Sequence, residues 1–536
     1  MILIRRFPIS VWAFAITLAA VTSLPYLLGA LNAPDGFRYS GAPALPAGLQ
    51  WDFNSHMAKM WQGERGHWDY HLLFTHEAHP GLPLIQGFYV ALGMLTRVIP
   101  LSLPLLFHLA RLVLTLIMVL ALWSWAAYFF QTRLECWICL LSATIVSGWS
   151  WLLLLLAPGM TAQVSPIEFW LTDAFNLMGA LFVPHFAAAI ILQIVIVLAF
   201  AQWIQQAGTG RLIILTLTLT GEAIIQPYSV LLLGSLLLLL SLYHIRLTRK
   251  LSWKRALQLV PPLGLYGVVV LYQYLAMQAD PVWSNFVEQN QTRSPAVVYY
   301  LLGYLPLLLP FVFALAQRKL EKSLLIPLCW IIVVALLVYA PFPTQRRYLL
   351  GVQTPLAVLA TWGWSRAILP RFSRQRYPLL FIVYFAFASI ASVLMLLANT
   401  TSLARADHLK VLYYSSDEIQ GYDWLMTHTD IDDLVFAASK AGEFGSGGKV
   451  VAVTGRRVFT GHWIETAHFK DKVLQIEQFY DPETTDAWRQ NFLEEINASY
   501  VWYDEHDQSI GCWNPSTAAY LEAAFVSKTV IIYRVQ

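Results

Sequence analysis

The sequence predicts a mostly α-helical protein in which a polytopic transmembrane bundle of about eleven spans precedes a small extracytoplasmic α/β domain. Two observations predict this class. Of 536 residues, 57% are hydrophobic and only 12% are charged, whereas average soluble domains have about 45–50% apolar and about 25% charged residues. So few charges cannot cover the surface of a water-soluble protein of this size. In addition, apolar segments long enough to cross about 30 Å of hydrocarbon recur along the first four hundred residues.

Eleven apolar segments are predicted to span the membrane. They are residues 9–29, 104–130, 134–157, 182–204, 211–226, 228–245, 256–276, 298–316, 323–341, 348–368 and 378–398. Segment 81–99 is shorter than a usual span and follows a proline, so we expect it to lie in the membrane interface. Residues 1–6 and the run after them resemble a signal peptide, but no small-residue cleavage site stands out. We therefore predict a retained anchor.

Basic residues fall on alternate connections between these spans. With Arg5 and Arg6 inside, the same side receives Arg133, Arg211 and the basic clusters at 246–255, 318–322 and 366–376. Cytoplasmic loops are the ones enriched in lysine and arginine. The sequence therefore predicts an integral protein of the plasma membrane with a cytoplasmic N-terminus, and an odd number of spans places the C-terminal end outside.

Two large regions are predicted outside the membrane. The first loop (residues 30–103) lies within a transmembrane domain predicted over 1–398, and the tail (residues 399–536) forms the soluble domain. In the tail we predict strands at 433–439, 449–459, 499–505 and 528–535, with helices near 417–428, 468–480 and 484–497. The segment GEFGSGGKV (442–450) lacks both the GxGxxG spacing and the Walker lysine–hydroxyl pair, so a plain turn is predicted.

Charge and cysteine content exclude several classes. The net charge of +3 is too small to indicate a nucleic-acid partner. The four cysteines cannot form a disulfide framework. Cys136 and Cys139 have CxxC spacing, but they begin an apolar helical run, so we interpret them as core residues.

The first loop carries the candidate chemistry. Asp52, His56 and Lys59 are spaced i, i+4 and i+7, which places them on one face of a helix. The opposite face carries side chains that suit a membrane interface: Phe53, Met57, Met60 and Trp61. Such a helix along the outer surface would aim Asp52 at the mouth of the bundle. The alternative is that Asp52 is a helix N-cap or a solvated loop charge.

This arrangement resembles the GT-C class of polytopic glycosyltransferases, which includes protein mannosyltransferases and aminoarabinose transferases. In that class a large outside loop follows the first span. It carries an early acidic residue, a helix that ends near a glycine, and a proline-containing juxtamembrane helix. Here Asp52, Gly63 and the run HPGLPL ending at Leu84 fill those places. The class often ends in an extracytoplasmic domain.

The second outside loop of the class often holds another acidic residue. In PIEFWLTDAFNLMGALFVPH the match is Asp173, with Glu168 as a weaker one. The acidic pair usual at the first-loop position is missing, because Phe53 follows Asp52. The subfamily therefore stays unassigned.

The resemblance implies a sugar donor linked to a polyprenyl phosphate and an acceptor on the outer face, which is a glycan, a lipid or a protein. An acceptor hydroxyl is a poor nucleophile, so a carboxylate must take its proton as C1 is attacked. The resemblance makes Asp52 the general base, with inversion at C1, and Asp173 a second catalytic residue. The departing lipid phosphate gains charge that cations or a metal must stabilise.

Arginines on the predicted outer side are candidates for binding that phosphate. Arg346 and Arg347 stand at the start of a predicted span, where guanidinium groups can bind phosphate bidentately. The alternative is a juxtamembrane pair that snorkels to lipid headgroups. Arg293 is a weaker candidate of the same kind.

Histidines cluster in the first loop, and five of the thirteen lie between His56 and His79. His67 and His71, spaced i, i+4, could share a divalent metal, and so could His76 with Glu77 or His79. Of these, His76 and His79 are the favoured ligands of a Mg or Mn ion, since metal dependence varies within the resembled class. Alternatively, His56, His76 and Glu77 contact the donor phosphate or the acceptor. The simplest interpretation is a polar loop whose histidines bind neighbours or water.

Two further segments are ambiguous. Glu222 interrupts an apolar stretch and either lines the cavity where the lipid-linked sugar enters or belongs to a tight hairpin. In GRRVFTGHWIET (455–466), Trp463 either stacks on a sugar ring or packs within a loop.

Two other functions compete with the glycosyltransferase. A transporter or flippase of lipid-linked saccharides should carry broken helices and ionisable residues near the midplane in both halves, whereas the polar groups here collect at the predicted outer mouth. An O-antigen-type polymerase or ligase places its main outside loop late among the spans, whereas here that loop comes first.

Overall fold

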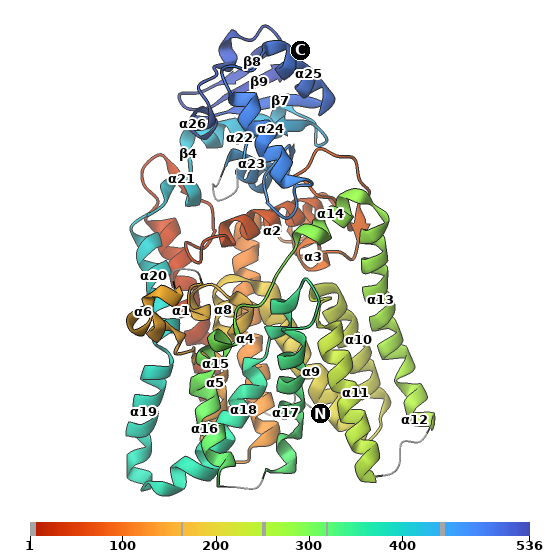
Figure 1. Ribbon diagram of the computed structural model, residues 1–536, viewed down its shortest axis with the longest axis vertical. Helices are drawn as coiled ribbons and strands as arrows, with labels where there is room; N and C mark the ends of the chain where they lie inside the picture. Colours follow the sequence, from red (N-terminus) through yellow and green to blue (C-terminus); the bar gives the residue numbers. More distant parts are fainter. Residues whose placement is uncertain (1–6, 162–163, 249–252, 318–319, 440–444) are drawn as a thin grey trace. The chain divides into compact units, whose positions relative to one another are not determined.

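The computed structural model describes residues 7–161, 164–248, 253–317, 320–439 and 445–536 (Figure 1). Contacts divide the chain into two compact units. The first contains Met1–Leu24, His108–Tyr272 and Thr292–Ala398, and the second contains Pro25–Phe107, Gln273–Gln291 and Asn399–Gln536. The second unit thus combines the whole of the first loop with the tail. The predicted division into 1–398 and 399–536 stays a prediction.

The regular secondary structure described in the first unit is entirely helical. Its helices are α5 (Arg133–Thr144), α6 (Leu153–Leu156), α7 (Pro158–Thr161), α8 (Asn176–Phe182), α9 (Pro184–Gln205), α10 (Thr209–Ile225), α11 (Ser229–Thr248), α12 (Trp253–Gln258), α15 (Val297–Gly303), α16 (Leu305–Leu315), α17 (Leu325–Leu337), α18 (Gln353–Gly363) and α19 (Tyr377–Ala388). Four helices contribute to both units: α1 (Ile9–Leu31), α4 (Leu103–Phe129), α13 (Val260–Ala279) and α20 (Ile390–Ala404).

Five described helices are long and apolar enough to cross a membrane, namely α1, α4, α9, α11 over Ser229–Arg246, and α13. Two bent pairs raise the number to seven if each pair is one span: α15 with α16, bent by 80°, and Arg374–Ala388 with Ile390–Ala404, bent by 55°. The chain is therefore an integral membrane protein. The prediction of about eleven spans is not confirmed.

Helix α9 is the centre of the first unit. The buried share of its most apolar window is 83%, against 22% for α13. Figure 1 shows α9, α10 and α11 beside one another, and these helices contact one another. Helix α9 is thus enclosed by protein, whereas α13 leaves most of its apolar side chains available to lipid.

The predicted span 134–157 is wrong as a continuous helix, because α5 ends at Thr144. Beyond this point the backbone bonds to other helices: the Ser147 amide donates to the Ala388 carbonyl at 2.8 Å, and the Trp149 amide to the Leu302 carbonyl at 3.0 Å. A Cβ atom on Gly148 would lie 2.4 Å from the carbonyl oxygen of Gly303. The glycine thus permits a close backbone approach that replaces a helical turn.

The second unit contains a five-stranded sheet with the order β6-β5-β7-β9-β8. Its strands are β5 (Leu434–Phe436), β6 (Arg457–Val458), β7 (Ala498–Tyr503), β8 (Leu521–Val526) and β9 (Ile531–Val535). Strand β5 runs parallel to β6 and β7, and β9 runs antiparallel to β7 and β8. Alternate residues enter two different buried clusters, with Phe436 and Val501 in one and Val435 and Trp502 in the other. Both faces of the sheet are therefore buried.

The tail helices are α21 (Leu409–Leu412), α22 (Ser416–His428), α23 (Ser446–Thr454), α24 (Phe469–Tyr480), α25 (Asp486–Glu495) and α26 (Glu505–Ile510). Three of them match the helices predicted near 417–428, 468–480 and 484–497. The strand predicted at 449–459 is wrong, because most of it belongs to α23 and only Arg457–Val458 is extended. Part of the predicted turn 442–450 also begins this helix, and its residues 442–444 lie outside the described residues.

Tertiary contacts explain this helix despite its β-branched valines. The Arg65 guanidinium donates to the carbonyls of Thr454 and Gly455, at 2.8 Å each, and so caps the helix end. The Trp61 indole donates to the Ala452 carbonyl at 2.9 Å. Such contacts override intrinsic strand propensity.

Within the first loop lie α2 (Leu49–Glu64), α3 (Gly87–Met94) and the strand pair β2 (Asp69–Tyr70) with β3 (Leu82–Pro83). Strand β1 (Phe37–Tyr39) of the first loop pairs with β4 (Tyr413–Ser415) of the tail. The second unit also contains α14 (Pro281–Gln289). The run HPGLPL is not helical as the family pattern implies, because it contains β3 and α3 begins only at Gly87. At about 12 Å long, α3 is too short to cross a bilayer.

Helix α2 is the helix predicted from the spacing of Asp52, His56 and Lys59, and it ends one residue after Gly63. A Cβ atom on Gly63 would lie 1.9 Å from the Val90 carbonyl oxygen of α3, so the glycine allows the two helices to touch. The apolar face predicted to meet the membrane interface is instead packed inside the protein. Phe53, Met57 and Met60 are buried and Trp61 is half-buried.

Candidate functional site

Asp52 lies in the first turn of α2 and contacts the tail. The N-cap of this helix is Gly48, so Asp52 is not the N-cap. Its carboxylate oxygen Oδ1 lies 3.3 Å from Nε2 of His462, whose side chain is 4% exposed, whereas the Asp52 side chain is 50% exposed. The aspartate is therefore open to solvent on one side and held by a buried imidazole on the other.

Backbone hydrogen bonds determine which ring nitrogen of His462 carries the proton and can donate it to Asp52. The backbone amides of Ile464 and Glu465 both donate to Nδ1 of His462 at 3.3 Å. A nitrogen that accepts hydrogen bonds carries no proton, so in the neutral ring the proton is on Nε2. His462 therefore donates its Nε2–H to the Asp52 carboxylate.

A buried ion pair lies directly behind this contact. The Lys59 ammonium donates to Glu465 Oε1 at 2.9 Å, and both side chains are 3% exposed. Ser55 donates to the same oxygen and Tyr70 donates to Oε2, each at 2.5 Å. Burial by itself raises the pKa of Glu465, but the Lys59 charge and these hydrogen bonds outweigh it and hold the pKa below its usual value. Glu465 is therefore ionised at neutral pH.

A second ionic contact joins the first loop to the tail. The Lys472 ammonium donates to Glu77 Oε2 at 2.8 Å, and the Arg457 guanidinium donates to the His76 carbonyl at 2.8 Å. Burial, together with the Lys472 charge, lowers the pKa of His76 to about 4, so its ring is neutral at pH 7. Burial also lowers the pKa of Lys472 to about 8, with Glu77 opposing this shift.

The remaining predicted residues of the first loop are packed against the protein. The His56 ring stacks on Tyr89 with centroids 3.9 Å apart. His79 uses both ring nitrogens on the backbone: Nε2 accepts from the Leu72 amide at 2.9 Å, and Nδ1 donates to the Glu77 carbonyl at 2.7 Å. No group of three or more His, Cys, Asp or Glu side chains suited to a metal occurs among the described residues. The metal site at His76 and His79 therefore stays a prediction that the geometry does not strengthen.

In the first unit, the structure brings Asp173 and Arg347 together. Their Oδ1 and Nη1 atoms lie 3.4 Å apart, and the carboxylate is buried while the guanidinium is partly exposed. The neighbouring Arg346 guanidinium lies 4.9 Å from the centre of the Trp170 ring. Arg347 lies 6.0 Å from the centre of the Tyr228 ring. The two arginines are thus positioned by a carboxylate and by aromatic rings.

Three other acidic or basic candidates differ from this pair. Glu168 is buried and accepts a hydrogen bond from the Ser150 amide at 2.7 Å, so it is engaged by its own surroundings. Glu222 is buried between helices and accepts a hydrogen bond from the side-chain amide of Gln193 at 3.0 Å. Arg293 is exposed.

The predicted site residues thus fall into two groups. Asp52, His56, His76, Glu77 and His79 belong to the second unit, and Asp173, Arg293, Arg346 and Arg347 belong to the first. The sequence also indicated the polar segment 455–466, which contributes His462 and Glu465, but it did not connect that segment with Asp52. No sequence pattern indicated Lys472, because a lysine within an amphipathic helix cannot be distinguished from a solvated surface residue.

Comparison with known proteins shows the fold. No protein-family model matches the sequence, and neither does any curated protein. Among solved structures, ArnT from Cupriavidus metallidurans bound to undecaprenyl phosphate is similar with a TM-score of 0.52 at 11% identity, over 97% of this chain and 98% of that chain. The arabinofuranosyltransferase AftD from Mycobacteria is similar with a TM-score of 0.54 at 13% identity, over 97% of this chain and 40% of that chain. The chain therefore has the fold of GT-C glycosyltransferases, which confirms the predicted resemblance and leaves the subfamily unassigned.

The buried ion pair gives a prediction about stability. Glu465→Gln leaves the Lys59 ammonium buried without its counter-charge, so we expect a loss of about 3–5 kcal/mol in the free energy of unfolding. Lys410→Gln is the matched control. It breaks a pair with Glu505 whose side chains are 84% and 57% exposed, and we expect a change of about 1 kcal/mol or less.

The measurement is a urea titration of the purified protein in detergent, followed by limited proteolysis of the tail. The double variant Lys59→Met, Glu465→Met should recover most of the lost stability, because two apolar side chains leave no buried charge. Equal unfolding midpoints for Glu465→Gln and the wild type would show that the pair does not hold the tail.

Proposed function

We propose that this protein is a membrane glycosyltransferase that moves a sugar from a polyprenyl-phosphate donor to an acceptor on the outer face of the plasma membrane. The observation that carries the proposal is the half-exposed Asp52 carboxylate, held by the buried His462 in a chain with the GT-C fold. The ArnT structure, which is similar over nearly its whole length, has undecaprenyl phosphate bound. This supports a donor of the same chemical kind here.

In the proposed reaction Asp52 is the general base. One carboxylate oxygen accepts the N–H of His462, and the exposed side of the group takes the proton of the acceptor hydroxyl or amine. The acceptor atom then forms a bond to C1 of the sugar as the bond from C1 to the phosphate oxygen breaks. Attack from the face opposite the leaving group gives inversion at C1.

The leaving group is the lipid phosphate, which gains negative charge as the bond to C1 breaks. Arg346 and Arg347 are proposed to bind it, because guanidinium groups match phosphate oxygens in geometry and charge. Asp173 was predicted as a second catalytic residue. Its contact with Arg347 supports a different task, which is to orient that guanidinium.

The proposal keeps the predicted orientation, with a cytoplasmic N-terminus and an extracytoplasmic tail. Four further residues stay candidates for contacts with the substrates: Arg293, His56, His76 and Glu77. No step is assigned to a divalent metal, because His79 already uses both ring nitrogens.

The first test concerns Asp52. Asp52→Asn keeps the shape of the side chain but removes the base, so we expect the transfer rate to fall by about 10²–10⁴-fold. Transfer is measured in membrane vesicles supplied with a panel of radiolabelled polyprenyl-phosphate sugars. Asp471→Asn is the matched control, because Asp471 also lies in the first turn of a helix of the second unit and is exposed. Wild-type turnover by Asp52→Asn would exclude it as the base.

The second test concerns His462 as the residue that positions Asp52. Removing a hydrogen bond to a charged group costs about 1.5–3 kcal/mol, so we expect His462→Ala to lower kcat by about tenfold or more. His462→Gln supplies a side-chain N–H donor and should restore most of kcat, with KM unchanged. His428→Gln, an exposed histidine of the tail, is the control. If the His462→Gln and His462→Ala variants have equally low kcat, the N–H contact with Asp52 does not account for the loss.

The third test concerns the leaving group. Arg347→Gln removes a cation that stabilises the departing phosphate, so we expect kcat to fall by about 10²-fold. Asp173→Asn should reproduce part of this loss, and the double variant should be no worse than Arg347→Gln alone, because both changes act on one guanidinium. Arg374→Gln, an exposed arginine of the first unit, is the control. Additive losses at 173 and 347 would mean that Asp173 has an independent role.

A further inference from the structure

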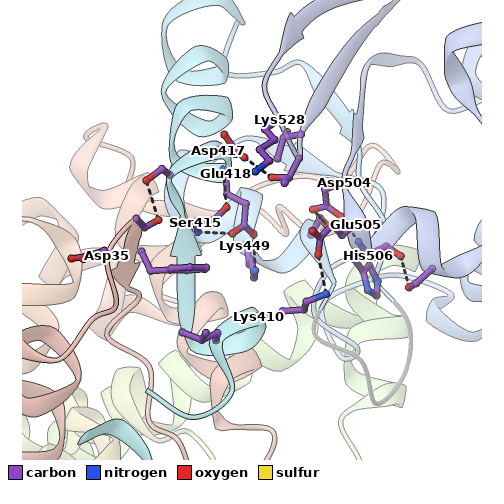
Figure 2. A pocket seen from close by; sticks show the side chains of 18 residues that line it. Asp35, Lys410, Ser415, Asp417, Glu418, Lys449, Asp504, Glu505, His506 and Lys528 are labelled. Atoms are coloured by element: carbon purple, nitrogen blue, oxygen red, sulfur yellow. Dashed lines mark hydrogen bonds and ion pairs between the residues drawn. The ribbon is translucent and has the colours of Figure 1, made fainter. Parts of the chain in front are cut away.

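The second unit contains a cavity of about 550 Å³ that none of the residues proposed for the reaction lines. Small-molecule sites typically have volumes of about 300–1,000 Å³. Figure 2 shows the lining side chains, which come from residues 35–37 at the start of β1, from α21, from the first turns of α22 and α23, from α26, and from the turn between β8 and β9. Segments far apart in the sequence therefore meet at one place and build its walls.

Three helices begin at this cavity, and polar side chains already satisfy two of these helix starts. Ser415 caps α22 together with Glu418 in a capping box. Asp504 caps α26 and accepts a hydrogen bond from Ser446 in the first turn of α23 at 2.5 Å. The positive ends of these helix dipoles thus face carboxylates of the protein itself.

The charges lining the cavity do not favour an anionic ligand. Carboxylates of Asp35, Asp417, Glu418, Asp504 and Glu505 outnumber the ammonium groups of the lining lysines 410, 449 and 528. Burial alone raises the pKa of Asp504, but hydrogen bonds from Ser446 and Trp502 and the charge of Lys449 hold it below its usual value. A phosphate would therefore meet the ionised carboxylate of Asp504.

A neutral ligand rich in hydroxyl groups matches the same lining. Each hydroxyl can donate to a carboxylate and accept from an ammonium group, and both kinds of partner surround the cavity in Figure 2, as with Lys449 beside Glu418 and Lys410 beside Glu505. The Phe37 ring and the aliphatic side chains of Leu409 and Val530 line the cavity as well. Sugar rings present C–H faces that pack on such apolar groups.

We propose that this cavity binds a neutral saccharide and forms an accessory subsite for a glycan acceptor. The binding of the saccharide follows from the cavity, whereas its assignment as acceptor rests on the proposed glycosyltransferase function. The subsite is built by the second unit alone, which also carries Asp52. It selects the acceptor by hydroxyl groups that do not react.

The test measures binding without turnover. The full-length protein in lipid nanodiscs is titrated with fluorescent neutral di-, tri- and tetrasaccharides of glucose, galactose, mannose and arabinose, and separately with inorganic phosphate. We expect at least one saccharide to bind. Glu505→Gln removes a carboxylate of the lining, and we expect affinity to fall by about tenfold. Ser509→Trp fills the cavity from an exposed lining position and should abolish binding.

Glu483→Gln and Lys470→Gln are the controls, since both residues are exposed and lie outside the cavity. They should bind the saccharide like the wild type. Thermal unfolding of each variant shows whether it is folded, and Glu505→Gln provides the test if Ser509→Trp is not. The proposal is overturned if no saccharide binds, if binding survives in folded Ser509→Trp or is unchanged in Glu505→Gln, or if phosphate competes for the site.

Failure of this proposal can be told apart from failure of the proposed function. Asp52→Asn should bind the saccharide with wild-type affinity, because Asp52 does not line the cavity. If the saccharide binds but no sugar is transferred, the proposed saccharide site stands and the proposed glycosyltransferase function is excluded. If sugar is transferred but the KM for a glycan acceptor is the same in Ser509→Trp as in the wild type, the glycosyltransferase function stands and the acceptor subsite is excluded.

Discussion

The pair of Lys59 and Glu465 is almost fully removed from water, and this constraint shapes the second unit. A buried charge without a partner is costly, so α2 and the tail segment 462–466 must stay together for either charge to be accommodated. Ser55 and Tyr70 complete the hydrogen bonds of the carboxylate. The lysine comes from the first loop and the glutamate from the tail. The two charges therefore hold the first loop and the tail together.

The position of Asp52 follows from this pair. Asp52 and Lys59 lie on the same helix, and His462 and Glu465 lie in the same short segment. Once Lys59 binds Glu465, His462 is brought to Asp52, and the backbone amides of 464 and 465 decide which ring nitrogen donates. Lys472 and Arg457 hold residues 76 and 77 in the same way. The tail is thus part of the candidate site as well as its support.

Much of this could be predicted from local pattern, and the errors have physical causes. The i, i+4, i+7 spacing correctly predicted α2, because helical periodicity is a local property. The apolar face of α2 was assigned to the membrane interface, since its buried partners, α3 and α23, are distant in sequence and cannot be read from the helix itself. The valines of 450–453 favoured a strand, but the contacts of Trp61 and Arg65 stabilise a helix there. His462 and Asp52 lie 410 residues apart in the sequence. No local pattern of residues can predict a contact over that separation.

The two candidate groups share one kind of contact and differ in which of its members is exposed. In each group a carboxylate meets a nitrogen donor: Asp52 with His462, and Asp173 with Arg347. In the first pair the carboxylate is the exposed member, which the proposed proton transfer from an acceptor requires. In the second the carboxylate is buried and the guanidinium is the more exposed member, which the proposed contact with a lipid phosphate requires. The two pairs therefore differ in which member is the more exposed, the carboxylate in one and the guanidinium in the other.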